Sequence, residues 1–304
     1  MPLRERVFGR LVTLAPNRKL TATRILAAEA SLVAQGQERA FVRSNATFVW
    51  SYYLQFARLA FRRGRARAYG RIRPHGEERL RAAAAQRRGM ILLSVHLGDF
   101  DVGGGWLVEQ GITPVVISRP LKPLWRQFLF SSVRRRCGVL LRELGATSLE
   151  ELEGDLRRRR AVLVMLDRRS TGPSSPSRIL GRTAVAPLAV GLLAARSQAP
   201  LLPAATWRGN DGALIAWFGE PFTAADPVQA MARISEVAEG LGRLIRAHPE
   251  QWHVPADLGE MAWAPPEARE GAPGGRLYPS GDMFSATAAR ISAFNASSSI
   301  SSPS

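Results

Sequence analysis

From residue 90 onward, short apolar runs alternate with longer segments of helical character, and this alternation limits the possible folds more than any other feature. The apolar runs are MILLSV, ITPVVIS, AVLVML, APLLPAATW and GALIAWFG, and the helical segments include WRQFLFSSVRRRCG and LEELEGDLRRRR. Runs of this length are typical of buried strands, and strands that alternate with helices form α/β domains. We therefore expect one α/β domain with a mixed, largely parallel central sheet flanked by helices.

Three regions differ in composition. Residues 1–89 are predicted to be helical, and residues 90–263 are predicted to form the α/β core in one domain with them. Residues 264–304 are rich in Pro, Gly, Ser and Ala, which predicts a disordered tail. The 304 residues, of which 46% are hydrophobic, suffice for a sizeable core.

The N-terminal region carries aromatic and basic residues in succession. Asn45 is expected to cap a helix over residues 46–61. This stretch contains Phe48, Trp50, Tyr52, Tyr53, Phe56 and Phe61, and an arginine-rich run over residues 62–73 follows it. Aromatic rings beside guanidinium groups suit a helix at a membrane interface. A helix packed into the core, followed by a solvated basic loop, fits the same pattern, and both interpretations stay open.

The charge balance is strongly basic. Lys and Arg total 42 against 25 Asp and Glu, which gives a net charge of +17, and Lys19 and Lys122 are the only lysines. Because a guanidinium group binds two phosphate or carboxylate oxygens at once, the excess of arginine predicts an anionic partner. Membrane lipid, nucleic acid and an acidic carrier protein all fit. No apolar run reaches the roughly 18 residues of a spanning helix, so none is expected.

Several common enzyme sites have no counterpart in the sequence. Neither lysine lies in a Walker A loop, and the glycines at 103–105 lack the spacing of a dinucleotide fingerprint. No G-x-S-x-G elbow and no histidine pair with zinc-ligand spacing occurs. These absences exclude P-loop nucleotide hydrolysis and weigh against dehydrogenases, serine hydrolases and zinc enzymes. We expect neither a metal nor a cofactor.

A histidine and two carboxylates follow the first apolar run. His96 begins the segment HLGDFD, in which Gly98 eases a turn and Asp99 and Asp101 follow. Ligands of open α/β sheets bind beyond the carboxyl ends of the strands, so His96 is predicted to face a site. Asp101 is the predicted partner that orients the imidazole, and Asp99 is its rival.

Two other predicted strands also end in charged residues. Arg119 follows the run PVVIS, and Asp167 and Arg168 follow AVLVML. If these strands lie beside the first, a base, a carboxylate and several guanidinium groups line one mouth of the sheet. Which of Asp99, Asp101 and Asp167 orients His96 stays open.

The segments HLGDFD, SRPLKPLWRQFLFSSVRRRCGV, LDRR, ILGR, PLAVGLLAARSQAPLLPAATWR and HPEQWH occur in this order along the chain. Their order over about residues 65–255 resembles the lipid A biosynthesis acyltransferase family. HLGDFDVGGGWL and LDRR are closer in pattern to its phosphatidylinositol mannoside acyltransferases than to its lauroyl transferases, which more often have glutamate in place of Asp101.

The chain departs from the family pattern in four places. Asp99 and Phe100 replace a common Asn-Trp pair, and Ala189 replaces a common glycine. The segment 170–186 contains no acidic residue, so a second catalytic carboxylate would come from Asp167 or Asp99. Lipid A members usually carry an N-terminal transmembrane helix, whereas this chain has only the amphipathic region, which implies peripheral attachment.

The resemblance implies a glycerophosphate-acyltransferase-like fold and an O-acyltransferase activity. A fatty acyl chain would move from acyl-CoA or acyl carrier protein to a hydroxyl of a membrane glycolipid or lipid A-type acceptor. The implied catalytic pair is His96 and Asp101, and the implied substrate-binding residues are Arg119, Asp167, Arg168, Gly98 and Asp99. Transfer would be direct, with the oxyanion stabilised by N–H groups around Gly98 or by Arg119.

The implied location is the cytoplasmic face of the bacterial plasma membrane, on an anionic surface, with no nucleic acid bound. A thioesterase-like hydrolase and a non-catalytic arginine-rich protein that binds membrane or nucleic acid are the alternatives. The acyl thioester would be a co-substrate, so no cofactor is implied.

Overall fold

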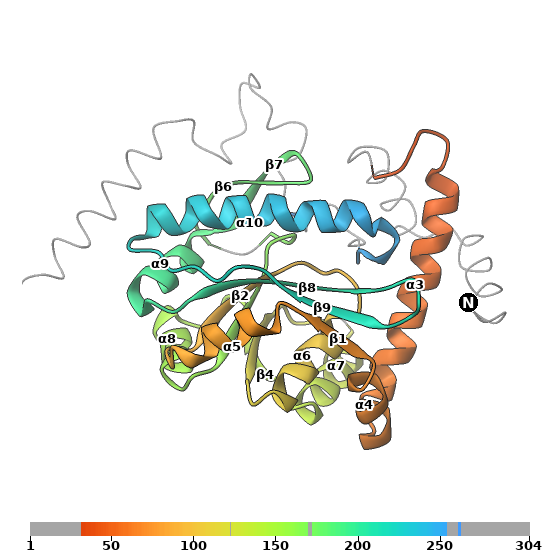
Figure 1. Cartoon of the computed structure of the whole chain (residues 1–304), viewed down its shortest axis with the longest axis horizontal. Coiled ribbons are helices and arrows are strands. Elements are labelled where there is room, and N and C mark those ends of the chain that lie inside the picture. Colours follow the sequence, from red (N-terminus) through yellow and green to blue (C-terminus); the bar gives the residue numbers. More distant parts are fainter. Residues whose placement is uncertain (1–31, 122, 170–171, 254–260, 263–304) are drawn as a thin grey trace, which may run out of the picture.

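The computed structural model describes residues 32–121, 123–169, 172–253 and 261–262 (Figure 1). The predicted tail over 264–304 and the first 31 residues of the predicted helical region lie outside the described residues. Within the described part, seven strands form one sheet in the order β1-β9-β8-β2-β5-β3-β4. The strands are β1 Ile72–His75, β2 Met90–Ser94, β3 Pro114–Ser118, β4 Leu140–Glu143, β5 Ala161–Met165, β8 Leu201–Arg208 and β9 Leu214–Phe218. A separate antiparallel hairpin joins β6 Ser174–Ile179 to β7 Arg182–Pro187.

The sheet is mixed and largely parallel, as predicted. Neighbours from β8 through β2, β5 and β3 to β4 run parallel, and only the β8–β9 pair is antiparallel. The described helices are α3 Glu38–Arg58, α4 Arg62–Tyr69, α5 Glu77–Ala85, α6 Phe100–Glu109, α7 Leu124–Arg136, α8 Leu149–Arg157, α9 Leu188–Ser197 and α10 Pro227–Ala247, with a short 3-10 turn at Pro249–Gln251. None of these helices is long and apolar enough to cross a membrane.

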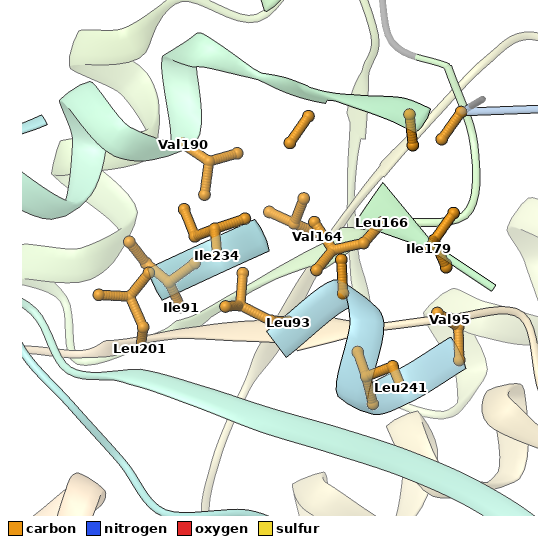
Figure 2. Close-up of a cluster of buried hydrophobic side chains, with 14 of the residues drawn as sticks. Ile91, Leu93, Val95, Val164, Leu166, Ile179, Val190, Leu201, Ile234 and Leu241 are labelled. Atoms are coloured by element: carbon orange, nitrogen blue, oxygen red, sulfur yellow. The ribbon is translucent and has the colours of Figure 1, made fainter. Parts of the chain in front are cut away.

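The central strand β2 is buried on both faces because helices cover each side of the sheet. Ile91 and Leu93 point into one hydrophobic cluster with α9, α10 and the hairpin, as Figure 2 shows. Met90 and Leu92 point into the other cluster, with α5, α6 and α7. All five residues of β2 are buried. A continuous apolar run is the pattern expected of a parallel strand between two helical layers.

Five strands appear where the apolar runs predict them, and three further elements were missed. Strand β1 lies in the region predicted to be wholly helical and pairs with β9 at one edge of the sheet. Strand β4 forms the opposite edge, and the β6–β7 hairpin packs on α10. Strands β1 and β4 have only four residues each, β6 contains Pro176, and all of these strands carry polar residues and are exposed in part. Such strands lack the apolar run by which the central ones are found.

Helix α3 contains five of the six aromatic residues of the predicted interfacial stretch. It begins at Glu38, so Asn45 does not cap it. Asn45 is buried and its side-chain amide donates to the carbonyls of Glu250 (3.0 Å) and Trp252 (2.8 Å). Three of the six aromatic side chains, Phe48, Tyr52 and Phe56, are buried. Half of the rings predicted for a membrane interface therefore pack inside the protein, whereas Tyr53 and Phe61 are exposed.

Candidate active site

Three adjacent parallel strands end at one place. Strand β5 lies between β2 and β3, and Ser94 is level with Met165 in the β2–β5 ladder. His96 and Asp167 each come two residues after those partners, and Arg119 directly follows β3. The hypothesis that the three strand ends are neighbours is confirmed.

Asp167 is the carboxylate that contacts His96. Its Oδ1 accepts a hydrogen bond from His96 Nδ1 at 2.9 Å, and its Oδ2 accepts from the His96 backbone N–H at 3.2 Å. An ionised carboxylate can only accept, so Nδ1 carries the proton and Nε2 is the basic nitrogen. The His96 side chain is a quarter exposed, whereas Asp167 is fully buried behind it.

The surroundings of Asp167 keep it ionised. Burial by itself raises the pKa of this carboxyl, but the Arg168 charge, His96 and the Trp252 indole N–H outweigh burial and hold the pKa well below its usual range. Arg168 Nη1 lies 3.1 Å and Trp252 Nε1 lies 2.9 Å from Asp167 Oδ2. The carboxylate therefore accepts four hydrogen bonds in a dry setting, which fixes its position and its charge.

Asp101 does not contact His96, contrary to the expectation from spacing. Its Oδ1 accepts from Arg134 Nε at 2.7 Å, its Oδ2 accepts from Arg134 Nη2 at 3.1 Å, and the Tyr52 hydroxyl donates to Oδ2. Because Asp101 lies in the first turn of α6, its side chain points to α3 and α7 instead of back to the strand end. Burial and the neighbouring Asp101 carboxylate raise the pKa of Tyr52 well above its ordinary value, so Tyr52 stays a hydrogen-bond donor.

The rival carboxylate, Asp99, is also occupied elsewhere. It binds Arg208 of β8 with both oxygens, at 2.6 and 2.8 Å. The Arg208 guanidinium in turn lies 4.9 Å from the centre of the Phe48 ring. Asp99 therefore fastens α6 to β8 and α3, and it does not orient His96.

The segment after the 3-10 turn supports His96 from behind. The His253 backbone N–H donates to the His96 carbonyl at 2.9 Å, and the His253 Nε2 donates to the Gly98 carbonyl at 2.9 Å. Gly98 has a φ of +62°, and a Cβ there would lie 2.3 Å from the Thr206 carbonyl oxygen, so only glycine fits. The Gly98 N–H donates to the Gln251 carbonyl at 3.0 Å. Of the N–H groups around Gly98 that were expected to stabilise an oxyanion, that of Gly98 itself is therefore not free.

A cavity of about 790 Å³ opens in front of His96. Of the predicted site residues, His96, Asp101, Arg119 and Arg168 line it, whereas Gly98, Asp99 and Asp167 do not. Apolar side chains from β3, β5, α7 and α9 form much of the remaining wall, and they include Ile117, Val164, Phe130 and Leu193. A basic nitrogen thus faces a large, mostly apolar cavity with guanidinium groups at its edge.

The arginines at the mouth differ in what they hold. Arg168 donates to Asp167 and to the His253 carbonyl, so its guanidinium braces the carboxylate. Arg119 is exposed and donates from Nη2 to the Arg169 carbonyl. Within the described residues, no group of three or more His, Cys, Asp or Glu side chains is placed to bind a metal.

Four residues of the site were not predicted from the sequence: Tyr52, Arg134, Trp252 and His253. Trp252 and His253 end the motif HPEQWH. Its aromatic and imidazole side chains beside an acidic residue could have indicated a site residue. Arg134 is one of three consecutive arginines, and Tyr52 is one of six aromatics in its helix. Nothing in the sequence distinguishes these two from their neighbours.

Comparison with known proteins agrees with the motif order. The profile of the family described as bacterial lipid A biosynthesis acyltransferases matches residues 8–254. The chain belongs to this family.

Its curated relatives cover part of the chain. A phosphatidylinositol mannoside acyltransferase of Mycobacterium tuberculosis is 29% identical over 186 residues, which are 59% of this chain and 57% of the relative. The protein of the same name from Mycolicibacterium smegmatis is 26% identical over 172 residues, 55% of each chain. The match thus spans little more than half the length of these relatives.

A solved structure, that of 1-acyl-sn-glycerophosphate acyltransferase from Thermotoga maritima, aligns with 82% of this chain and 99% of its own. Its sequence identity is 12% and the TM-score is 0.38.

Proposed function

We propose that this member of the lipid A biosynthesis acyltransferase family is an O-acyltransferase that moves a fatty acyl chain from a thioester to a hydroxyl of a membrane glycolipid. The observation that carries the proposal is the His96–Asp167 pair at the wall of an apolar cavity. The donor would be acyl-CoA or acyl carrier protein, and the acceptor a phosphatidylinositol mannoside or lipid A-type glycolipid. The names of the family and of the relatives support this acceptor class.

The chemistry requires a base that faces the substrate. His96 Nε2 would take the proton of the acceptor hydroxyl while its oxygen attacks the thioester carbonyl carbon. The ester C–O bond forms, the C–S bond breaks, and the imidazolium returns its proton to the thiolate. Asp167 would hold the tautomer and stabilise the imidazolium charge, the part that Asp101 was expected to play.

Direct transfer fits the nucleophiles that the site offers. Cys137 is buried and does not line the cavity, and burial raises the pKa of its thiol. A thiol of that kind is a poor nucleophile. The Arg119 guanidinium at the mouth would bind the oxyanion or a phosphate of one substrate, and the Gly98 N–H is already bonded.

The acceptor class places the enzyme at a membrane. We propose that the protein attaches peripherally to the cytoplasmic face of the bacterial plasma membrane, where its net charge of +17 favours anionic lipid.

Thioester consumption with and without an acceptor glycolipid tests the proposal. We expect thiol release that depends on the acceptor, together with an acylated lipid product. Release of free fatty acid without acceptor would identify a thioesterase instead. No thiol release under either condition, with lipid binding intact, would identify a non-catalytic binding protein. Transfer that survives His96→Ala would reject the mechanism.

A further inference from the structure

Helix α7 leaves large apolar side chains in solvent. Leu124, Trp125, Phe128 and Leu129 are 82%, 64%, 76% and 44% exposed. They are four of the eight exposed large hydrophobic residues in the part of the chain that the structure describes. Three of the other four, Tyr53, Leu54 and Phe61, belong to α3 or the turn after it. A concentration of this kind on one helix marks an interaction surface.

The exposed residues occupy one face of α7 because they recur at i, i+1, i+4 and i+5. Arg135 and Arg136 come three turns after Leu124 and Trp125 and extend this face, and both are exposed. We call the six residues Leu124, Trp125, Phe128, Leu129, Arg135 and Arg136 the α7 outer face. Helix α7 contains no Asp or Glu. The outer face is therefore apolar at one end and cationic at the other.

The opposite face of α7 forms a wall of the cavity. Arg126, Gln127, Phe130, Ser131 and Arg134 line the cavity that His96 faces. Phe130 also stacks on Phe56 of α3, with ring centroids 4.5 Å apart, and Arg134 binds Asp101. The helix is thus held firmly on its inner side while its outer face is open to solvent.

We propose that the α7 outer face docks the protein on an anionic lipid bilayer, beside the mouth of the cavity. Trp and Phe side chains settle among lipid headgroups and acyl chains, while arginines bind lipid phosphates. An anionic bilayer presents negatively charged headgroups above an apolar layer of acyl chains, so it matches both the positive charge and the apolar side chains of this face. The contact places a lipid leaflet one helix away from the catalytic cavity. This inference rests on the proposed function only where it explains what the contact is for, namely the delivery of a lipid substrate to the cavity.

The site differs from the one predicted from the sequence. The sequence offered the aromatic and basic region up to residue 73 as a membrane contact, and three of its aromatic side chains, Phe48, Tyr52 and Phe56, are buried. Helix α7 was predicted only as a helix between strands. Its outer face carries half of the exposed large hydrophobic side chains in the described residues.

Vesicle co-sedimentation of the full chain tests the proposal without any turnover. The probes are vesicles of phosphatidylcholine with and without phosphatidylglycerol. We expect Trp125→Ala/Phe128→Ala to weaken binding to the anionic vesicles by about tenfold or more. Arg135→Gln/Arg136→Gln should weaken it by about fivefold per arginine, with no effect on neutral vesicles. Val228→Ala and Arg87→Gln/Arg88→Gln remove matched exposed side chains elsewhere and should bind as wild type.

Several results would overturn the proposal. One is that the wild-type protein does not bind anionic vesicles at all. The others are that both α7 variants bind as tightly as the wild type, or that the control variants lose as much binding as the α7 variants. A change of oligomeric state in Trp125→Ala/Phe128→Ala, with vesicle binding unchanged, would assign the face to a second copy of the chain. A lower Tm with unchanged binding would assign it to another segment of the same chain. Vesicle binding that depends on α7 in a protein without acyltransferase activity would support this inference and reject the proposed function alone.

Discussion

The two sides of the cavity hold their carboxylates in different ways. On the sheet side, Asp167 meets His96 across two neighbouring parallel strands, 71 residues apart in sequence. On the helix side, Asp101 lies five residues from His96 yet binds Arg134 and Tyr52, which belong to α7 and α3. The nearer carboxylate in sequence braces helices, and the distant one orients the base.

Backbone direction explains this difference. After β2 the chain turns at Gly98 into α6. Side chains in the first turn of α6 point away from the helix axis, and that of Asp101 points to α3 and α7 and not to His96. Strand ends in a parallel ladder have no such freedom, because the register of β2 and β5 brings His96 and Asp167 level. Position in a ladder is therefore a better guide to contact at this site than spacing along the chain.

The largest expected effect is at the base itself. His96→Ala should lower the turnover of acyl transfer by about 100- to 10,000-fold, the usual worth of a general base. The fold should persist, because His96 is partly exposed and packs on Phe100 alone among the described aromatic rings. His75→Ala, which changes an exposed histidine of β1, is the matched control and should leave turnover unchanged. Equal rates for both variants would remove His96 from the mechanism.

Asp167→Asn sharpens the comparison of the two carboxylates. An amide can present its NH₂ group to Nδ1 and so favour the wrong tautomer, and turnover should fall on the order of 100-fold. The loss should appear in turnover more than in the Michaelis constant, since Asp167 does not line the cavity. Steady-state kinetics of folded protein, verified by circular dichroism, measure this. A loss confined to Tm, with normal turnover, would give Asp167 a purely structural part.

The depressed pKa of Asp167 leads us to expect that stability depends on pH. The folded-state pKa of Asp167 is depressed, so its ionised contacts stabilise the protein above the ordinary value of about 3.9. That contribution is lost as the pH falls through the folded-state pKa. Denaturant unfolding at neutral and acidic pH should show a smaller decline for Asp167→Asn than for the wild type. If the free energy of unfolding declined equally in the two proteins, ionisation of Asp167 would not contribute to the loss of stability in acid.

Asp101→Asn should act mainly on stability. It weakens a bidentate, partly buried ion pair with Arg134 and should lower the free energy of unfolding by about 2 kcal/mol. Turnover of the folded protein should change little, because His96 keeps its partner. Adding Arg134→Met removes the cation left unpaired and should recover part of the loss, which a double-mutant cycle measures. Turnover that falls further than in Asp167→Asn would return the orienting part to Asp101.

The sequence was sufficient for the central strands and for the place of the site. Continuous apolar runs found β2, β3, β5, β8 and β9, and charged residues at three strand ends located the mouth. The partner of His96 could not be chosen, because the choice depends on strand order and on the direction of α6. Edge strand β4 and the β6–β7 hairpin were missed since partial exposure leaves them without a continuous apolar run. The Arg134 contact was hidden among equivalent arginines.

The smallest expected effect tests whether the third strand end belongs with the other two. Arg119 is exposed at the mouth of the cavity, and within the described residues its Nη2 donates to the Arg169 carbonyl. Arg119→Lys keeps the charge but loses the planar fork that binds two oxygens at once. We expect the Michaelis constant to rise about tenfold for the substrate whose phosphate or carbonyl Arg119 holds.

Varying donor and acceptor separately identifies which substrate Arg119 holds. Arg178→Lys is the matched control, because Arg178 is also exposed and donates to a backbone carbonyl, that of Gly181, away from the cavity. A higher Michaelis constant for one substrate, absent in the control, would place the end of β3 in the substrate-binding site. The ends of β2 and β5 already carry His96 and Asp167. Fall of turnover for both substrates would instead assign Arg119 to the oxyanion, since a group that binds only the transition state alters turnover. Wild-type kinetics in Arg119→Lys would limit the site to β2 and β5, and the guanidinium at the mouth would serve only to join β3 to the loop after β5.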